Sequence, residues 1–420
     1  MPVPSGPQRA RQEQGLPNVE PVIVPTGVAG LSRLSDLLAE RLAGHGSPIA
    51  LIPQIGPLTP PAMAERITTA LAPGMPSDNA EAIVVVSTSG STGDPRGVLH
   101  SVRSLTSLTT AVHARVTGTP TWIAALPLTS MGGLNVLVRA LATDRQPIAL
   151  PSLGGAAPFQ SRDLADAVAA ATRPIAVSLV AAQLARLLDD VVGITALQAC
   201  DLVLIGGGPL PAHLADRAAD AGIAVTRTYG STETSGGCVF NGEPLPSVQV
   251  TAGTDPAHPA TIRLGGPMLA LGYRHDAMGT ARAFTPDGLI TSDLGYLDDD
   301  GRLHVVGRSD DVVIVRGVNI SLPAVAEVAG QGLPCVAVAI PQAAASSSTA
   351  GDPVIVVCIA RGTGEPGSMR TDVDLGAVQR LVRERLGPPA VPRDILVVND
   401  LPMLPNGKPD RALIAQWAQD

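Results

Sequence analysis

Hydrophobic and polar positions change their spacing repeatedly along the first part of the chain. Short runs of apolar and β-branched residues, as at 82–86 and 202–205, are typical of buried strands, and apolar residues at helical spacing separate them. Strands that alternate with helices in this way predict parallel sheets covered by helices. The expected helices are 32–43, 101–116, 133–142, 163–171, 181–190 and 211–221, and the expected strands are 82–86, 121–126, 175–179, 202–205 and 223–229.

The spacing changes from about residue 239, where short strands and turns replace the helices. Asp299-Asp300-Gly301 separates two extended segments and predicts a hairpin turn. Beyond Arg308 the pattern indicates a smaller unit with an Ala/Ser-rich surface loop at 343–350. The expected strands of this region are 260–264, 289–306, 312–316, 335–340, 354–360 and 395–398, and the expected helix is 375–386.

Together these patterns predict the α/β fold class. We expect a large N-terminal domain at 21–309, built from helix-covered sheets plus a small β-barrel-like part. We expect a small, mobile α+β C-terminal domain at 310–420 and a flexible, Pro-rich tail at 1–20. With 45% apolar residues and a mean hydropathy of +0.26, the 420-residue chain can form large cores.

The composition argues against several classes of protein. The net charge of −8, without a basic stripe, disfavours nucleic acid as a partner. No apolar run approaches the ~20 residues that span a bilayer, and residues 1–19 lack the apolar region of a signal peptide. The four cysteines form no CxxC pair, so we expect free thiols in a reducing compartment. We therefore expect a cytoplasmic protein without a membrane partner. The sequence does not decide whether the protein forms a homodimer.

A Gly-, Ser- and Thr-rich loop, STSGSTGDPRG at 87–97, directly follows the expected strand at 82–86. Its glycines allow the backbone to turn tightly with N–H groups pointing inward, and its hydroxyls and Arg96 add further donors. This pattern predicts an anion cradle suited to phosphates. The loop lacks the GK[ST] ending of a Walker A motif, and a plain linker would seldom start directly from a core strand.

Lys408 is the only lysine among the 29 lysine and arginine residues. An ammonium group is a compact charge on a flexible stem, which a planar guanidinium does not reproduce in a tight site. Lys408 is therefore either a chance survivor of an arginine bias or a position that requires an ammonium group. The chain has only three tyrosines, Tyr229, Tyr273 and Tyr296, and all of them lie in or beside the motifs that follow.

The loop at 87–97 resembles the phosphate-binding signature of the adenylate-forming superfamily, which comprises acyl-CoA and aryl-CoA ligases, luciferases and nonribosomal adenylation domains. Arg96 stands where that signature usually has a lysine. Further motifs follow in the order of the superfamily, and the resemblance spans about residues 80–411. They are GGGPL at 206–210, YGSTE at 229–233, TSDLGY at 291–296, GRSDD at 307–311, GVNI at 317–320 and PNGKP at 405–409.

The resemblance implies a nucleotide site formed by these motifs, with ATP and Mg²⁺ bound. Glu233 would hold Mg²⁺ through a hard carboxylate oxygen, and Tyr229 would stack on adenine. Thr232 would donate to the α-phosphate, while Asp293 and Arg308 would contact the ribose. The other implied nucleotide contacts are Thr88, Ser89, Gly90, Ser91, Thr92, Gly93, Gly206, Gly207, Gly208 and Gly230.

The resemblance also assigns roles to the smaller domain. Lys408 would be the catalytic lysine, acting together with Thr232 and Arg96. Asp310 would be the hinge about which the domain turns, and Gly317 would line the tunnel for coenzyme A. A motion of this kind would couple two half-reactions at one site.

Three segments, at 126–134, 177–186 and 229–248, resemble one branch of the superfamily, the o-succinylbenzoate–CoA ligases of menaquinone biosynthesis in their short actinobacterial form. The branch implies an ATP- and CoA-dependent ligase that joins a small-molecule carboxylic acid to a thiol through an acyl-adenylate. Thr129 and Ser130 depart from it, because relatives usually carry a histidine or an aromatic residue there. Either His100 compensates for the missing histidine or it lies at the surface, and a surface position is the usual one for a lone histidine after a loop, so we expect His100 there. Another aryl- or acyl-CoA ligase, or a degenerate nucleotide-binding relative with weak catalysis, remains an open alternative.

Overall fold

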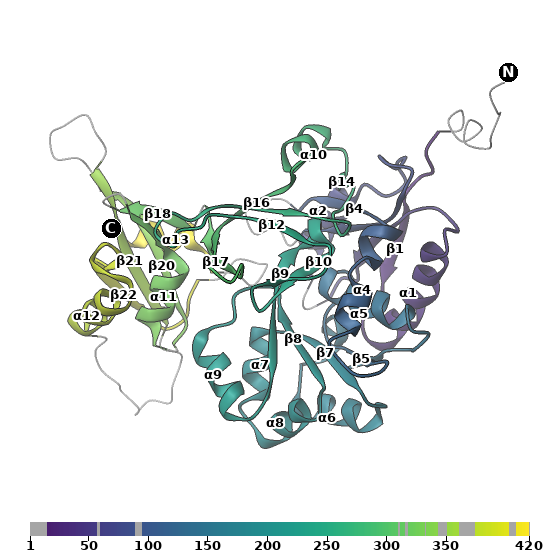
Figure 1. Ribbon diagram of the computed structural model, residues 1–420, viewed down its shortest axis with the longest axis horizontal. Helices are drawn as coiled ribbons and strands as arrows, with labels where there is room; N and C mark the ends of the chain where they lie inside the picture. Colours follow the sequence, from purple (N-terminus) through teal and green to yellow (C-terminus); the bar gives the residue numbers. More distant parts are fainter. Residues whose placement is uncertain are drawn as a thin grey trace. The chain divides into compact units, whose positions relative to one another are not determined.

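The computed structural model describes residues 15–56, 59–88, 95–309, 311–315, 318–331, 333–342, 351–360, 374–402 and 409–419 (Figure 1). The chain divides into two compact units. The first comprises Met1–Val250 and Leu264–Ile290, and the second comprises Thr251–Arg263 and Thr291–Asp420. Residues on both sides of position 309 group in the second unit, and the expected single domain boundary at that position stays a prediction.

One sheet of the first unit has the strand order β1-β2-β3-β4-β14. Its first three strands are parallel, whereas β4 runs antiparallel to both β3 and β14. Most residues of β2 and β3 are buried, which explains why these strands are apolar throughout. The elements are β1 (Glu20–Val24), α1 (Gly27–Leu42), β2 (Ile49–Pro53), α2 (Pro61–Leu71), β3 (Ala82–Ser87), β4 (Gly97–Ser101) and β14 (Gly272–Tyr273).

The residues before β1 are packed against the first unit. Val19 is fully buried, and its backbone N–H donates to the carbonyl oxygen of Met75 (2.9 Å). The expectation of a flexible tail reaching residue 20 is therefore wrong at its end, because apolar Val19 joins the core and Glu20 already pairs in β1. Residues 1–14 lie outside the described residues.

The second sheet of this unit has the order β11-β10-β9-β8-β7-β5-β6. Five neighbouring strands are parallel, namely β6, β5, β7, β8 and β9, and β10 and β11 continue the sheet with antiparallel pairings. The strands are β5 (Thr121–Ala124), β6 (Ile148–Ala149), β7 (Ile175–Val180), β8 (Leu202–Gly206), β9 (Val225–Ser231), β10 (Gly236–Phe240) and β11 (Glu243–Pro244). This arrangement confirms the predicted parallel sheet.

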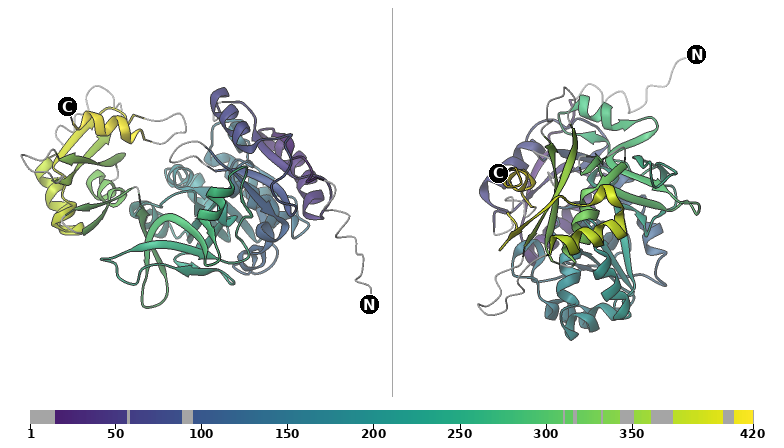
Figure 2. Two further views of the ribbon diagram at one scale, coloured as in Figure 1. Left: turned by 90° about the horizontal axis from the view of Figure 1, so that it is seen from above. Right: turned by 90° about the vertical axis from the view of Figure 1, so that its left-hand side faces the viewer.

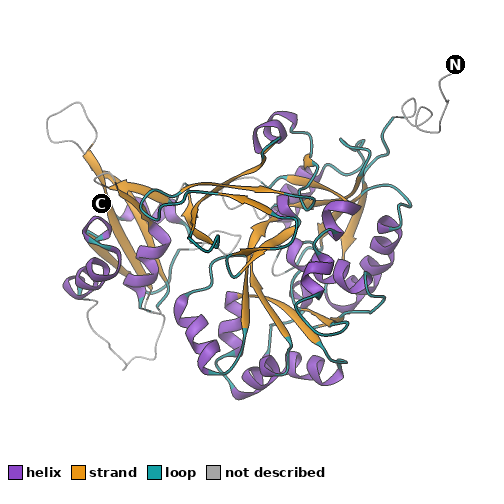
Figure 3. Ribbon diagram, in the orientation of Figure 1, coloured by secondary structure: helices purple, strands orange, loops and turns teal. Residues whose placement is uncertain are grey.

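Helices cover both faces of the second sheet (Figures 2 and 3). On one face, alternate residues of β7 and β8, such as Val177 and Val203, form a core with Leu164, Leu184 and Leu197 of the covering helices. On the other face α5 packs along β5. The helices are α5 (Met131–Leu141), α6 (Ser161–Ala170), α7 (Ala181–Leu187), α8 (Val191–Gln198) and α9 (Ala212–Asp220).

The single helix expected at 101–116 is wrong. The chain forms β4 up to Ser101 and then two short helices, α3 (Val102–Thr106) and α4 (Thr109–His113). The hydroxyl of Thr106 donates to the carbonyl oxygen of Val102 (2.8 Å), and the hydroxyl of Ser107 donates to the carbonyl oxygen of Ser104 (3.4 Å). Hydroxyl groups that bond nearby carbonyls in this way compete with the regular helical ladder, so this segment breaks.

A third sheet has the order β12-β13-β16-β15, with β17 paired to β16. β16 and β17 form the predicted hairpin, in which the carboxylate of Asp298 accepts from the backbone N–H groups of Asp300 and Arg302. Gly301 has a φ of 75°, which suits glycine at this turn. The elements are β12 (Gln249–Thr251), β13 (Ala260–Gly265), α10 (Ala277–Ala283), β15 (Phe284–Thr285), β16 (Gly288–Leu297) and β17 (Leu303–Arg308).

The C-terminal part of the second unit is an α+β arrangement. β20 pairs antiparallel with β21, and β21 pairs parallel with β22. One face of this sheet packs on α11 and α12, and the other packs on α13. The elements are β18 (Val312–Val315), β19 (Val318–Ser321), α11 (Leu322–Gly330), β20 (Cys335–Gln342), β21 (Gly351–Ala360), α12 (Leu375–Leu386), β22 (Asp394–Val398) and α13 (Arg411–Trp417). The α/β fold class is confirmed.

Two further expectations concern membranes and cysteines. The described part of the chain contains no helix with the length and apolarity to cross a membrane. All four cysteines carry free thiols, as expected, with Cys238 and Cys358 buried. Burial raises the pKa of the Cys238 thiol to about 12, so it behaves as an unreactive apolar side chain.

Candidate functional site

The predicted adenine and phosphate motifs lie at the carboxyl ends of adjacent parallel strands. β8 ends at Gly206, and β9 beside it carries Tyr229 and Gly230. The hydroxyl of Thr228 donates to the carbonyl oxygen of Ile205 (3.2 Å), and a Cβ on Gly206 would lie 2.7 Å from that hydroxyl. Ligands in open α/β sheets bind at this edge. The structure therefore brings the turn of Gly206, Gly207 and Gly208 next to the Tyr229 motif.

A sharp hairpin connects β9 to β10 and carries the acidic residue of the motif. A Cβ on Gly230 would lie 2.0 Å from the carbonyl oxygen of Gly236, so only glycine permits this approach. Between them, Thr232–Thr234 forms a single 3₁₀ turn. The hydroxyl oxygen of Thr234 accepts from the N–H of Ser231 (2.8 Å). The turn thus fixes Thr232 and Glu233 just beyond Tyr229.

Glu233 is held from outside its own turn. The backbone N–H of Ala270 donates to its carbonyl oxygen (2.8 Å), and the hydroxyl of Tyr273 donates to its carboxylate Oε1 (3.0 Å). Burial and the nearby Glu233 charge raise the pKa of Tyr273 well above its ordinary value, so the phenol remains a donor. The Glu233 carboxylate is therefore oriented and partly exposed, and its oxygens are of the hard kind that a Mg²⁺ ion prefers.

A magnesium ion fits this carboxylate. Mg²⁺ in nucleotide sites commonly uses one or two carboxylates, with substrate phosphates and water completing the shell. Among the described residues no group of three or more His, Cys, Asp or Glu side chains could hold a metal by itself. Glu233 would thus hold Mg²⁺ in partnership with a bound nucleotide.

The base of the predicted phosphate loop is closed by two hydrogen bonds between Thr88 and Arg96. The N–H of Thr88 donates to the carbonyl oxygen of Arg96 (2.8 Å), and the N–H of Arg96 donates to the Thr88 hydroxyl (2.9 Å). Arg96 is exposed, and its Cζ lies 4.9 Å from the centroid of the Tyr273 ring. Residues 89–94 lie outside the described residues, and they include the other predicted nucleotide contacts of the loop: Ser89, Gly90, Ser91, Thr92 and Gly93.

Asp293 and Arg308, the predicted ribose contacts, meet in the second unit. They are direct cross-strand partners on β16 and β17. The N–H of Asp293 donates to the hydroxyl of Thr291 (3.0 Å), and both predicted residues are partly exposed. The remaining predicted site residues, Asp310, Gly317 and Lys408, lie outside the described residues.

Comparison with known proteins decides the family. The model of the AMP-binding enzyme family matches residues 31–267, more than half of the chain. This chain belongs to the AMP-binding enzyme family. A probable 2-succinylbenzoate–CoA ligase from Mycobacterium tuberculosis is 37% identical over 401 residues, which cover 94% of this chain and 97% of the relative. A 2-succinylbenzoate–CoA ligase from Geobacillus kaustophilus is 28% identical over 344 residues, covering 77% of this chain and 67% of the relative.

Solved structures show the same fold. The o-succinylbenzoate CoA synthetase from Bacillus subtilis, in complex with the acyl-adenylate intermediate OSB-AMP, superposes with a TM-score of 0.70 and 20% identity. That likeness covers 97% of this chain and 90% of the other. ATP-bound MatB from Rhodopseudomonas palustris gives a TM-score of 0.73 with 21% identity, over 98% and 90% of the two chains. The adenylate-forming architecture of this AMP-binding enzyme is thus confirmed.

His100 of this AMP-binding enzyme is a core residue, and the expectation of a surface position is wrong. It is fully buried on β4, and its Nδ1 lies 3.1 Å from the hydroxyl of Ser235. The side-chain amide of Asn135 donates to the Ser235 carbonyl oxygen (2.7 Å). Ser235 follows Glu233 by two residues in a left-handed conformation with a φ of 52°. These contacts from β4 and α5 support the turn that carries Glu233.

Acid should destabilise the protein through His100. Burial lowers the folded-state pKa of His100 from 6.5 to about 3. Between these values the unfolded chain binds a proton that the folded chain does not, so stability falls as the pH drops from 6.5. Between pH 7 and pH 5 the free energy of unfolding of His100→Leu should therefore fall by about 2 kcal/mol less than that of the wild type.

Urea unfolding of the wild type and His100→Leu at both pH values measures this difference. The exposed His213 on α9 provides a matched control, and His213→Ala should follow the wild type. Parallel stability losses in the wild type and His100→Leu would show that His100 takes up its proton without unfolding.

Sequence reasoning did not predict the contacts of two side chains that support the site, Tyr273 and His100. The available signal for Tyr273 was its position beside a motif in a chain with only three tyrosines. No local pattern marks His100, because its partner Ser235 is 135 positions away.

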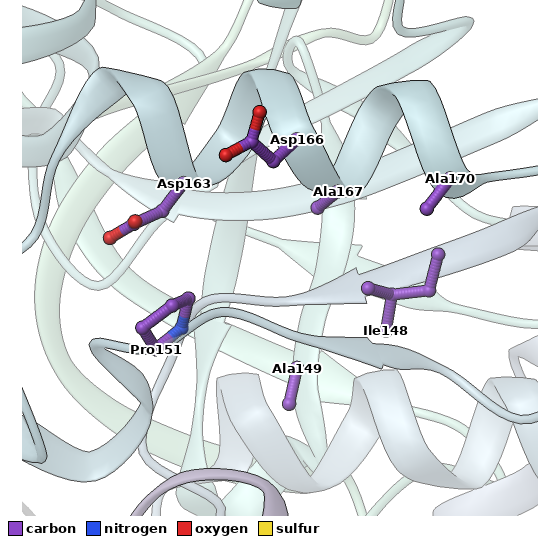
Figure 4. A pocket seen from close by; sticks show the side chains of 7 residues that line it. All are labelled: Ile148, Ala149, Pro151, Asp163, Asp166, Ala167 and Ala170. Atoms are coloured by element: carbon purple, nitrogen blue, oxygen red, sulfur yellow. The ribbon is translucent and has the colours of Figure 1, made fainter.

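A small cavity of about 240 Å³ lies apart from this site, between α6 and β6 at the far edge of the sheet (Figure 4). Its lining is mainly apolar, and Asp166 at its rim pairs with Arg162 (3.0 Å). The lining residues are Ile148, Ala149, Pro151, Asp163, Asp166, Ala167 and Ala170.

Proposed function

We propose that this enzyme joins 2-succinylbenzoate to coenzyme A in an ATP-dependent reaction through an acyl-adenylate, as a step of menaquinone biosynthesis. The observation that carries the proposal is a continuous set of contacts across its nucleotide motifs. Arg96 lies over Tyr273, and Tyr273 donates to Glu233, which follows Tyr229 at the strand edge beside Gly206. The near full-length similarity to a probable 2-succinylbenzoate–CoA ligase supports the choice of acid.

In the first half-reaction a carboxylate oxygen of the acid attacks the α-phosphorus of ATP. A bond forms between that oxygen and the α-phosphorus, the bond from the α-phosphorus to the oxygen bridging to the β-phosphate breaks, and pyrophosphate leaves with that oxygen. Tyr229 stacks on adenine, Thr232 donates to an α-phosphate oxygen, and Arg96 with the loop N–H groups offsets the charge of the leaving phosphates. Mg²⁺, when held by Glu233 and the phosphates, supplies further charge neutralisation.

The second half-reaction forms the thioester. The thiolate of coenzyme A attacks the acyl carbon, and AMP leaves with both electrons of the broken carbon–oxygen bond. We propose that, between the two half-reactions, domain 310–420 turns about Asp310 relative to domain 21–309. Lys408 faces the carboxylate and α-phosphate in the first state, and the Gly317 segment lines the CoA tunnel in the second. Asp293 and Arg308 hold the ribose.

ATP–pyrophosphate exchange across a panel of acids tests the proposal. The panel contains 2-succinylbenzoate, benzoate and octanoate, and coenzyme A is added afterwards. We expect the fastest exchange with 2-succinylbenzoate, followed by thioester formation. Faster exchange with another acid would identify a different aryl- or acyl-CoA ligase. Exchange with none of them would favour a degenerate nucleotide-binding relative.

The cellular setting is part of the proposal. We propose that the enzyme works in the cytoplasm without nucleic-acid or membrane partners. Light scattering of the purified protein distinguishes a monomer from the homodimer that the sequence leaves open.

A further inference from the structure

Tyr273 contacts both charged groups that the proposed function places around the ATP phosphates. Its hydroxyl donates to Oε1 of Glu233 (3.0 Å), and its ring lies 4.9 Å from Cζ of Arg96. Tyr273 is itself 7% exposed, so most of its surface is occupied by protein. One side chain therefore connects the phosphate loop to the metal-binding turn.

The surroundings of Tyr273 fix its position. In β14 it pairs with Val98 of β4, and its N–H donates to the hydroxyl of Thr280 (2.8 Å). The ring of Phe284 meets its ring edge-on, with centroids 5.5 Å apart and planes at 68°. A side chain restrained on its backbone and on its ring can orient its partners with little loss of entropy on ligand binding.

The residue after Tyr273 anchors the same strand. The side chain of Arg274 is fully buried and donates to Asp78 Oδ2 and to several backbone carbonyl oxygens. The carbonyl acceptors belong to Leu71, Ala72, Met75 and Pro76. A buried guanidinium with this many acceptors is costly to displace, so β14 forms a rigid support.

The ring of Tyr273 also accounts for arginine at position 96. A guanidinium is planar and stacks on aromatic faces more readily than an ammonium group does. Arg96 is otherwise exposed at the base of its loop, where a flexible side chain would sample many orientations. The ring restricts it to one side of the site.

We propose that Tyr273 is a positioning residue for adenylation, which orients the Glu233 carboxylate toward Mg²⁺ and supports Arg96 beside the phosphates. This inference rests on the proposed function, because it needs MgATP as the ligand. Tyr273 touches neither reacting atom, and it acts through its two partners.

Binding of ATP without an acid substrate tests the inference independently of turnover. Tyr273→Phe keeps the ring over which Arg96 lies and removes the hydroxyl, which contacts the side chains of both Glu233 and Arg96. Calorimetry should show that the Kd of MgATP rises about tenfold, the range for losing a hydrogen bond to a charged group. The Kd of ATP in excess EDTA should stay within about twofold.

A second pair of variants tests the ring. Arg96→Lys keeps the charge and loses the stack, so it should weaken metal-free ATP binding about threefold. The same change should have no effect in a Tyr273→Leu background, where neither cation has a ring. Arg115 lies over the Phe240 ring at 5.5 Å, and Arg115→Lys is a matched control that should leave ATP binding unchanged.

Specific outcomes would overturn the inference. An unchanged MgATP affinity in Tyr273→Phe, or an equal loss with and without Mg²⁺, would remove the link to Glu233. If Tyr273→Phe does not fold, Glu233→Gln replaces it, and a retained advantage of MgATP over metal-free ATP would contradict the inference. A wild-type protein that binds no MgATP would instead contradict the proposed function.

Discussion

Lys408→Ala should lower ATP–pyrophosphate exchange by on the order of 10²-fold or more, the effect of removing one preorganised charge contact from a transition state. Its amine would hold the attacking carboxylate and the α-phosphate together, two anions that repel each other. The change should largely spare thioester formation from chemically supplied acyl-adenylate, because in the proposed mechanism the lysine would have left the site by then. Rapid-quench measurement of each half-reaction separates the two effects.

Lys408→Arg is the informative control for this prediction. It retains the charge and loses the compact geometry, so adenylation should recover only in part. Equal damage to both half-reactions in Lys408→Ala would contradict the alternation of two states. Because Lys408 is the only lysine, reductive methylation of the protein provides a further check on the same side chain.

Asp310→Pro should give the opposite pattern. Proline fixes φ near −65°, so a residue that must change its backbone angles between two domain orientations cannot do so. We expect adenylation to persist and thioester formation to be lost. Stopped-flow measurement of acyl-adenylate formation, followed by quantification of the thioester, tests both statements on one sample.

Asp310→Ala separates the two properties of this residue. It removes the carboxylate and keeps a free φ angle, so it should retain more thioester formation than the proline variant. Normal thioester formation in Asp310→Pro would remove the assignment of a hinge at this position.

Elements with a regular pattern were predictable from the sequence. The helix expected at 375–386 has the bounds of α12, because its apolar residues recur at helical spacing between Asp374, which caps it, and Gly387. The strand expected at 202–205 forms β8, which is an apolar run buried on both faces. The hairpin turn at 299–301 follows from its Asp-Asp-Gly sequence.

Elements whose partners are distant in sequence were harder to predict. β4 contains His100 and Ser101, polar residues that suggest a surface segment, yet the sheet buries both. The strands β1 and β2 were not predicted from the sequence, and the structure identifies them by the pairing of β1 with β2 and of β2 with β3. Local pattern cannot show such burial, because it arises from neighbours that the fold supplies.

The candidate site divides in the same way. Motifs located Glu233, Arg96 and Tyr229, because each lies in a recognisable local sequence. The contacts that orient them were not accessible, since Tyr273 reaches Glu233 across 40 positions. Residue types thus suggested the chemistry, and tertiary structure supplied the geometry.

Isotope transfer from the acid to AMP tests the central claim most directly. The wild-type enzyme is incubated with ATP, Mg²⁺, coenzyme A and 2-succinylbenzoate whose carboxylates carry oxygen-18, and the products are analysed by mass spectrometry. Attack of a carboxylate on the α-phosphorus predicts AMP with one labelled oxygen, in equal amount to the CoA thioester. Thioester formation with unlabelled AMP, or with ADP and labelled phosphate, would contradict an acyl-adenylate pathway.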